Sequence, residues 1–281
     1  MTAERPARRF PLALGRLGAT AIKTRGTAAG GSATGPAMIR PQRHVATAHA
    51  DASRRGPAVG LGLDSADVRA RMVERLRAEG VAHPLVLAAF AAVPRHLFID
   101  AGLATQAYED TSLPIGHGQT ISKPSVVARM IELLFGGARA VGAGDLGAVL
   151  EIGTGCGYQA ALLGRVARRV VSVERLKPLH DKARELLAPM RGDGRLRLVF
   201  DDGMRGHSPG APYDSIIAAA GGSEIPQAWL DQLAVGGRLV SPVQQGSAGQ
   251  VLVVVDRHAD RYTRSVHEAV KFVPLKSGLA G

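Results

Sequence analysis

A glycine-rich loop between a short apolar strand and a helix restricts the fold of this chain more than any other feature of its sequence. Residues Ala148–Ile152 suit a buried strand, Gly153–Gly157 contain three glycines, and Tyr158–Val166 have helical periodicity. Glycine lets the backbone turn sharply and approach a ligand closely, and the start of the next helix offers free N–H groups. The pattern predicts a strand–turn–helix unit that binds a nucleoside cofactor. A purely structural glycine turn is the alternative.

The same alternation of strand, turn and helix continues toward the C-terminus. Further strands are predicted at 170–173, 196–200, 215–218 and 238–241, with helices at 178–187 and 226–233 and a glycine turn at 236–237. Residues 251–256 and 267–272 are expected to close the sheet as antiparallel strands. This alternation is typical of a doubly wound, Rossmann-like α/β sheet with helices on both faces.

The region before the sheet is predicted to be helical and then irregular. Helices are expected at 65–79, with Asp64 as the N-cap, at 83–93 and at 125–134. Residues 108–123, which include Gly116 and Gly118, are interpreted as a loop-rich stretch. Trp229, within the helix at 226–233, is expected to belong to the core.

Positive charge is concentrated at the N-terminus of the 281-residue chain. The net charge is +11, and residues 1–60 carry ten Lys and Arg against two acidic residues, which is +8 of that total. This segment has no strand or helix period and buries too little apolar surface to offset its ordering entropy. We predict a disordered basic tail over 1–60 and a folded domain over 61–281. An arm that binds polyanions is the alternative interpretation of the tail.

Acidic residues stand at the ends of the first three predicted strands. Glu151 precedes the glycine loop, Glu174 ends the second strand, and Asp202-Gly203 follow the third. A carboxylate at Glu174 can accept both ribose hydroxyls, and one at Asp202 can accept an adenine amino group, with Gly203 leaving space for the ring. Glu151 suits a cofactor with a cationic centre better than a pyrophosphate, which needs donors. A surface salt bridge for Glu174 and a plain turn at Asp202 are the alternatives.

Two other functional classes stay open on these residues alone. The loop satisfies the dinucleotide fingerprint as Gly155-x-Gly157-x-x-Ala160, as a nicotinamide-dependent oxidoreductase also would. The basic tail would suit an RNA-binding protein or a nucleic-acid methyltransferase. However, the chain has no Asn/Asp-Pro-Pro-aromatic segment, and its single cysteine, Cys156, lies in the glycine loop and not where a cytosine-attacking thiol belongs.

Cysteine content and hydropathy limit the cellular location. Because Cys156 is the only cysteine, no internal disulfide can form, and a reducing cytoplasm is expected. No apolar run is long enough to span a bilayer. Arg16, Lys23 and Arg25 interrupt the apolar stretch that an export signal would need.

Several short segments outside the glycine loop form a distinctive set. They are Leu113-Pro114-Ile115-Gly116-His117-Gly118-Gln119-Thr120-Ile121-Ser122, Val93-Pro94-Arg95, Tyr108 with Asp110, Ala211-Pro212-Tyr213-Asp214, Glu224-Ile225-Pro226 and Phe272-Val273-Pro274-Leu275. With these segments, the chain from about Asp64 to its end resembles the protein-L-isoaspartate O-methyltransferase family. Many methyltransferases share the glycine loop, but few share the Gln119–Ser122 stretch ahead of it.

The resemblance implies a fold, a reaction and a set of site residues. The sheet would have seven strands, mostly parallel, with a reversed strand near one edge, and 61–281 would form the methyltransferase domain. A methyl group would pass from S-adenosyl-L-methionine to the free carboxylate of L-isoaspartyl or D-aspartyl residues in damaged proteins, starting their repair through a succinimide. The implied catalytic residue is Ser122. The implied substrate residues are Ile115, Gln119, Thr120 and Val273. The implied cofactor residues are Thr120, Ile121, Ser122, Glu151, Gly153, Gly155, Gly157, Glu174, Asp202 and Gly203. No metal, obligate nucleic acid or membrane is expected, and the protein is expected to be a monomer.

The implied chemistry needs few titratable groups. An isoaspartyl carboxylate is ionised at pH 7 and is already the nucleophile, while the leaving group is a neutral thioether. Ser122 therefore fits the role of a donor that orients the carboxylate, with a helix cap before Pro124 as the alternative. His117 is interpreted as a residue of the surface or the substrate rim and not as a base. The segment 219–223 departs from the family pattern, which leaves the shape of the pocket wall open.

Overall fold

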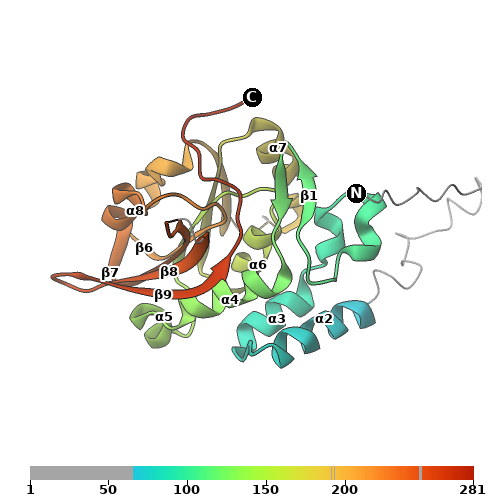
Figure 1. Cartoon of the computed structure of the whole chain (residues 1–281), viewed down its shortest axis with the longest axis horizontal. Helices are drawn as coiled ribbons and strands as arrows, with labels where there is room; N and C mark the ends of the chain where they lie inside the picture. The colour runs from blue at the N-terminus through green and yellow to red at the C-terminus, as the bar shows by residue number, and fades with distance from the viewer. Residues whose placement is uncertain (1–65, 191, 193, 247–248) are drawn as a thin grey trace, which may run out of the picture. The chain divides into compact units, whose positions relative to one another are not determined.

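The computed structural model of the chain describes residues 66–190, 192, 194–246 and 249–281 (Figure 1). The predicted tail over 1–60 and the predicted N-cap Asp64 lie outside these residues. In chain order the helices are α2 (Ala66–Ala78), α3 (Pro84–Ala92), α4 (Pro124–Phe135), α5 (Ala138–Ala143), α6 (Tyr158–Val166), α7 (Lys177–Leu186) and α8 (Gln227–Gln232). The 3-10 helices are η1 (Arg95–Phe98), η2 (Ala101–Gln106), η3 (Ala188–Met190), η4 (Gly203–Arg205) and η5 (Ser208–Gly210). The strands are β1 (Leu113–Gly116), β2 (Gln119–Ile121), β3 (Ala148–Ile152), β4 (Arg169–Glu174), β5 (Leu196–Phe200), β6 (Tyr213–Ala218), β7 (Leu233–Gln244), β8 (Gln250–Arg257) and β9 (Tyr262–Val270).

Seven of these strands form one sheet in the order β5-β4-β3-β6-β7-β8-β9. Strands β3 to β7 are parallel, and β8 runs antiparallel to both β7 and β9. This arrangement confirms the predicted doubly wound sheet, mostly parallel, with a reversed strand one position from its edge. The interior strand β3 is buried along its whole length, as expected for a parallel strand that helices cover on both faces.

Alternate residues of each strand supply two separate cores. Val149 packs into a large cluster with residues of α3, α4 and α6, whereas Leu150 packs into a second cluster with Trp229 of α8. Figure 1 shows α4 and α8 on opposite sides of the sheet. Trp229 is fully buried, which confirms its predicted place in the core.

Three segments differ from their predicted structures. Residues 108–123 were predicted to be a loop-rich stretch, but they contain the β1–β2 hairpin. The sequence did not reveal it because strands of four and three residues are too short to give a visible alternation. The predicted glycine turn at 236–237 lies inside β7. Leu233 pairs with Tyr213 and Arg238 with Ser215, so the residues between them form a bulge, and Gly236 takes the positive φ of 79° there. In addition, β9 begins and ends earlier than the predicted 267–272.

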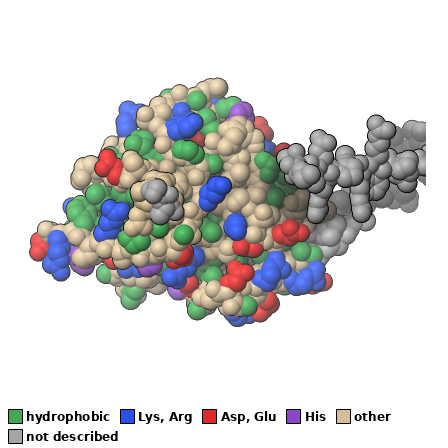
Figure 2. Space-filling model, viewed as in Figure 1, with side chains coloured by type: hydrophobic (Ala, Val, Ile, Leu, Met, Phe, Trp, Pro, Cys, Tyr) green, Lys and Arg blue, Asp and Glu red, His purple; other side chains and the backbone are tan. Residues whose placement is uncertain are grey.

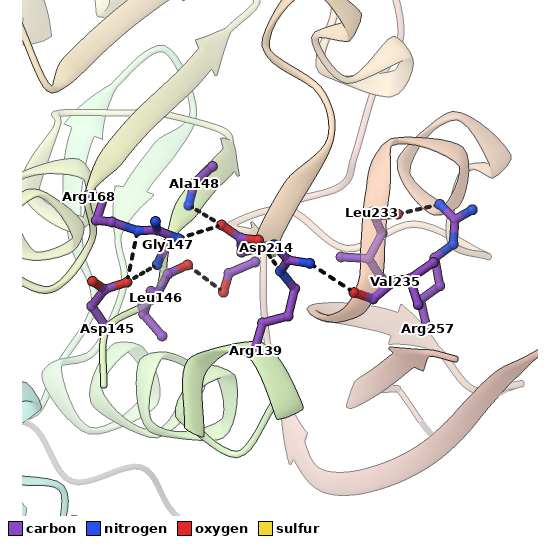
Figure 3. A network of polar contacts seen from close by, with 11 residues as sticks. Arg139, Asp145, Leu146, Gly147, Ala148, Arg168, Asp214, Leu233, Val235 and Arg257 are labelled. Carbon is purple, nitrogen blue, oxygen red and sulfur yellow. Dashed lines mark hydrogen bonds and ion pairs between the residues drawn. The ribbon is translucent and has the colours of Figure 1, made fainter. Parts of the chain in front are cut away.

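A polar network fastens the end of the sheet at which β3 begins (Figure 3). The Asp214 carboxylate accepts a hydrogen bond of 2.8 Å from the Ala148 amide and forms ion pairs with Arg139 and Arg168. One side chain of β6 therefore joins β3, α5 and the loop before β4. The network stabilises the end of the sheet opposite the carboxyl ends of its parallel strands.

Charges on the face shown in Figure 2 are of mixed sign, with basic and acidic side chains interspersed. None of the helices in the described residues combines the length and the apolar character required to cross a membrane.

Candidate active site

A pocket opens at the carboxyl ends of β3, β4 and β6, where doubly wound sheets bind their ligands. Its volume is about 880 Å³, counting the solvent at its mouth. Among the predicted site residues, the lining includes Ile115, Gln119, Thr120, Ile121, Ser122, Gly153, Gly155, Glu174, Gly203 and Val273. Glu151, Gly157 and Asp202 are predicted site residues that do not line it. Four separate parts of the chain thus meet at one cavity: the hairpin, the glycine loop, the strand ends and the C-terminal segment.

The glycine loop turns through backbone conformations that favour glycine. Gly153 and Gly155 have φ values of 91° and 56°, and both face the pocket. Gly157 has a φ of 92°, and a Cβ there would lie 2.8 Å from Cδ1 of Leu187. Gly157 therefore permits close packing between α6 and the segment after α7, and it stands behind the pocket wall.

Glu174 ends β4 with its carboxylate fixed by backbone amides. Its Oε2 accepts a hydrogen bond of 2.9 Å from the Gly155 amide, and its Oε1 accepts one of 2.9 Å from Leu176. Each carboxylate oxygen keeps a further lone pair for a ligand hydroxyl. The bond to Gly155 also ties the glycine loop to the end of β4.

Asp202 lies beside the pocket and its carboxylate is bonded within the protein. Oδ1 accepts from the Met204 amide at 2.9 Å, and Oδ2 accepts from the Gly278 amide at 2.7 Å. Its neighbour Gly203 lines the pocket, and the Gly203 carbonyl accepts a hydrogen bond of 2.8 Å from Trp229 Nε1. The core tryptophan thereby holds the turn that follows β5.

Buried polar atoms without partners gather around this cavity. Glu151 is fully buried and accepts a hydrogen bond from Ser172, but its Oε1 has no partner in the described part of the chain. The same holds for Tyr158 Oη and Gln159 Nε2, whose side chains line the pocket. Burial, with a smaller effect from the charge of Glu174, raises the pKa of Glu151 to about 8. Such unpaired groups fit a polar ligand such as a nucleoside cofactor better than an apolar one.

The hairpin brings Ser122 to the opposite side of the pocket. Ser122 follows the last residue of β2, is half-buried and lines the cavity. The alternative interpretation of Ser122 as a helix cap is wrong, because Lys123 holds the N-cap position of α4. The Ser125 amide of that helix donates instead to Asp110 Oδ1 at 2.9 Å. His117 is exposed at the hairpin turn and is absent from the lining.

The segment after β9 forms the remaining wall. Val273 and its next three residues line the pocket, and the Gly221 amide donates to the Val273 carbonyl at 2.9 Å. Farther along, Ala280 exchanges backbone hydrogen bonds of 2.9 Å with Arg175 and Lys177. Figure 1 shows this segment running from β9 past the sheet toward α7. Within 219–223, Ala219 and Ala220 line the pocket.

The comparisons with known proteins agree with this geometry. A model of the family described as protein-L-isoaspartate(D-aspartate) O-methyltransferase matches residues 67–280. A relative from Methylibium petroleiphilum, named protein-L-isoaspartate O-methyltransferase, is 59% identical over 277 residues, or 98% of each chain. The chain belongs to the protein-L-isoaspartate O-methyltransferase family. A second family member, from Leptothrix cholodnii, is 57% identical over 282 residues, which is 99% of this chain and 98% of the relative.

The fold of the chain is similar to that of solved structures that carry the same family name. A structure named protein-L-isoaspartate O-methyltransferase has a TM-score of 0.66 at 28% identity and covers 75% of this chain and 67% of its own. A Plasmodium falciparum protein assigned to the same class, in complex with S-adenosyl-L-homocysteine, has a TM-score of 0.62 at 22% identity, covering 73% and 97% of the two chains. The predicted fold, enzyme class, reaction and methyl donor are confirmed at the level of the family.

Some residues at the site escaped the sequence analysis. Thr154, Tyr158 and Gln159 line the pocket, as do Pro274, Leu275 and Lys276 after Val273. The sequence assigned Tyr158 and Gln159 only to the helix after the glycine loop, and their place directly after that loop is the one signal that could have identified them. The roles of the individual residues stay predictions.

Proposed function

We propose that this pocket is where the chain methylates the free carboxylate of L-isoaspartyl or D-aspartyl residues in damaged proteins. S-adenosyl-L-methionine is the donor, and the backbone nitrogen of the next residue then attacks the ester carbonyl, which closes the succinimide and releases methanol. The proposal is supported by one observation above all: the glycine loop, Glu174 and Gly203 meet at a single cavity, and the hairpin with Ser122 closes it.

The residues of the cavity have distinct tasks toward the cofactor. Glu174 would accept the ribose hydroxyls, and Gly203 leaves room for the adenine ring. The buried Glu151, whose raised pKa of about 8 keeps it protonated at neutral pH, would offset positive charge from behind the glycine loop by giving up that proton when the cationic cofactor binds. When bound, S-adenosylmethionine supplies a methyl group carried by a sulfonium. Once that methyl group has been transferred, the sulfur remains as a neutral thioether.

The chain's own contribution to the reaction is orientation and the exclusion of water. Because the substrate carboxylate is ionised at pH 7, no side chain has to remove a proton. Ser122 would donate a hydrogen bond to that carboxylate and direct one oxygen toward the methyl group. Ile115, Gln119, Thr120 and Val273 would enclose the isoaspartyl residue, and Thr120 and Ile121 would also bound the cofactor. Such positioning can supply roughly 7–11 kcal/mol of the barrier.

We also infer the setting in which the enzyme works. Cys156 is a buried free thiol, in keeping with a reducing cytoplasm. The interspersed charges in Figure 2 are in keeping with a protein that needs no nucleic acid, and we propose that it acts as a monomer. The damaged proteins it repairs would be recognised through the isoaspartyl residue itself. The tail over 1–60 would be dispensable for catalysis.

The experiment is transfer of tritium from labelled S-adenosylmethionine to an isoaspartyl peptide and to its normal aspartyl twin. Label in the first peptide alone is expected. Equal labelling of both, or of neither, would contradict the proposed substrate. A fragment over 61–281, assayed in parallel, is expected to match the full chain.

A further inference from the structure

Arg95 is a buried arginine directly behind the pocket wall. It is the first residue of η1 and its side chain is 0% exposed. Its guanidinium carbon lies 4.9 Å from the ring centroid of Tyr158, which lines the pocket. Arg95 itself is absent from the lining, so it can affect the reaction only through the residues it holds.

One nitrogen of Arg95 joins the two ends of the β1–β2 hairpin. Its Nη2 donates to the Ser122 carbonyl at 2.7 Å and to the Thr111 carbonyl at 3.3 Å. Thr111 precedes β1 and Ser122 follows β2, and the outermost backbone pair of the hairpin is Leu113 with Ile121. Beyond that pair the strands have no further ladder bonds, so Arg95 continues the pairing with a side chain.

Arg95 is costly to bury and its surroundings compensate it incompletely. Its Nε and Nη1 have no hydrogen-bond partner, and no carboxylate in the described residues lies within ion-pair distance of it, although the charge of Asp110 acts on it from farther away. Burial lowers the pKa of Arg95 from its usual value, yet an arginine side chain stays charged in proteins. The charge of Asp110 and the Tyr158 ring offset only part of the cost of burying it, and a buried cation without a paired carboxylate is a poor source of stability. A role in holding the site therefore accounts for it better than a role in the stability of the fold.

We propose that Arg95 is a positioning residue for methyl transfer, which fastens the base of the β1–β2 hairpin and so fixes Ser122 against the substrate carboxylate. This inference rests on the proposed function of the pocket. Asp110, the residue before Thr111, fixes the chain that follows Ser122, because it accepts from the Ser125 amide and hydroxyl at 2.9 and 2.7 Å. Ser122 thus stands between two fixed points.

The test compares Arg95→Lys and Arg95→Met with a matched control, Arg238→Met. Arg238 also donates to a backbone carbonyl, that of Leu133 at 2.9 Å, and pairs with Asp256, but it lies in the middle of β7 and does not line the pocket. Lysine keeps the charge without the planar fork, and methionine removes both. We expect kcat on the isoaspartyl peptide to fall roughly 10-fold for the lysine variant and roughly 100-fold for the methionine variant. The affinity for S-adenosylhomocysteine and the KM of the peptide should change by less than about threefold.

A purely structural arginine would give a different result. Folded variants with wild-type kcat and only a lower melting temperature would overturn the proposal, and that is the result expected of Arg238→Met. If the methionine variant does not fold, the lysine variant decides.

Hydrogen exchange separates this inference from the function on which it rests. In Arg95→Lys, amides 111–122 should exchange faster while those of 148–166 stay protected. If exchange changed equally in both segments, or in neither, Arg95 would not be what fastens the base of the hairpin. This result would hold even if the wild-type protein methylated no peptide. A wild-type protein that puts no label on isoaspartyl peptides would contradict the proposed function alone, provided that the exchange result is as expected.

Discussion

Ser122 lies at the end of β2 with its side chain half-buried in the pocket wall. The neighbouring helix does not use it as its N-cap, so its hydroxyl is available to a substrate. A hydroxyl that bonds a carboxylate contributes about 1.5–3 kcal/mol when the bond is well aligned. Its value to the reaction depends on where the hairpin places it.

The substitution Ser122→Ala is expected to lower turnover of the isoaspartyl peptide by roughly 10- to 100-fold, the kinetic equivalent of one such bond. Affinity for S-adenosylhomocysteine, measured by calorimetry, should stay close to wild type. Ser265→Ala, on the exposed strand β9, is the control and should change neither quantity. Wild-type turnover in Ser122→Ala would exclude the orienting role.

Single residues could be predicted from the sequence where a local motif carries them. Ser122, Glu174 and Gly203 each stand beside a recognisable turn or strand end, and the structure places all three at the pocket. Arg95 lies 27 residues before Ser122, and no spacing rule connects them. Their contact exists only because η1 packs under the hairpin.

Among the elements, the segment after β9 has the largest effect on the shape of the site. It reaches the pocket as an irregular chain, fixed by backbone bonds to Gly221 and by the bond from Gly278 to Asp202. Gly278 has a φ of 78°, in the left-handed region that favours glycine. The backbone at this point is therefore sensitive to any added side chain.

Gly278→Ala is expected to weaken S-adenosylhomocysteine binding several-fold, because about 1 kcal/mol of strain would loosen the bond to Asp202. Gly80→Ala is the matched control. Gly80 also has a positive φ and open space around it, but it follows α2, far along the chain from the site. It should lower stability and leave binding unchanged. Equal binding by both variants would argue against a role for the segment in holding the cofactor.

Helices and strands could be predicted from the sequence where the periodic segment is long enough to be recognised. The strands at 148–152 and 196–200 and the helix at 158–166 agree with β3, β5 and α6 residue for residue. The hairpin and α5 could not be predicted, because seven strand residues and a six-residue helix give too few repeats to show a period. The path of the last ten residues is set by tertiary contacts, which local sequence does not encode.

At the scale of the whole molecule, the buried Glu151 links the free energy of unfolding to pH. Its pKa rises from 4.5 to about 8 on folding, because burial disfavours the charged form. The folded protein then holds a proton that the unfolded chain releases. The stability that this group confers is complete below about pH 4.5 and is lost as pH rises toward 8.

Glu151→Gln should remove this dependence. The unfolding free energy of the variant relative to wild type should rise with pH between about 5 and 8, by at most about 1.4 kcal/mol per pH unit. Urea unfolding without cofactor at several pH values measures it. Glu185→Gln, on the exposed surface of α7, is the control and should show no such trend. A pH-independent difference for Glu151→Gln would mean that the carboxyl is ionised when buried.

The sheet order as a whole could be expected only through the family resemblance. The alternation of strands and helices predicts a doubly wound sheet, but it does not say that β8 inserts beside β7 and leaves β9 at the edge. That choice depends on which pairing buries Val253 and Val254 best, a property of the assembled core.

The participation of residues 273–276 in the pocket wall also has a consequence for biosynthesis. The ribosome makes these residues after every strand of the sheet. A nascent chain that has reached Val270 holds all the fully buried residues of its two cores, yet one side of its catalytic pocket is still missing. Translation that stops there would yield a protein able to fold but unable to repair others.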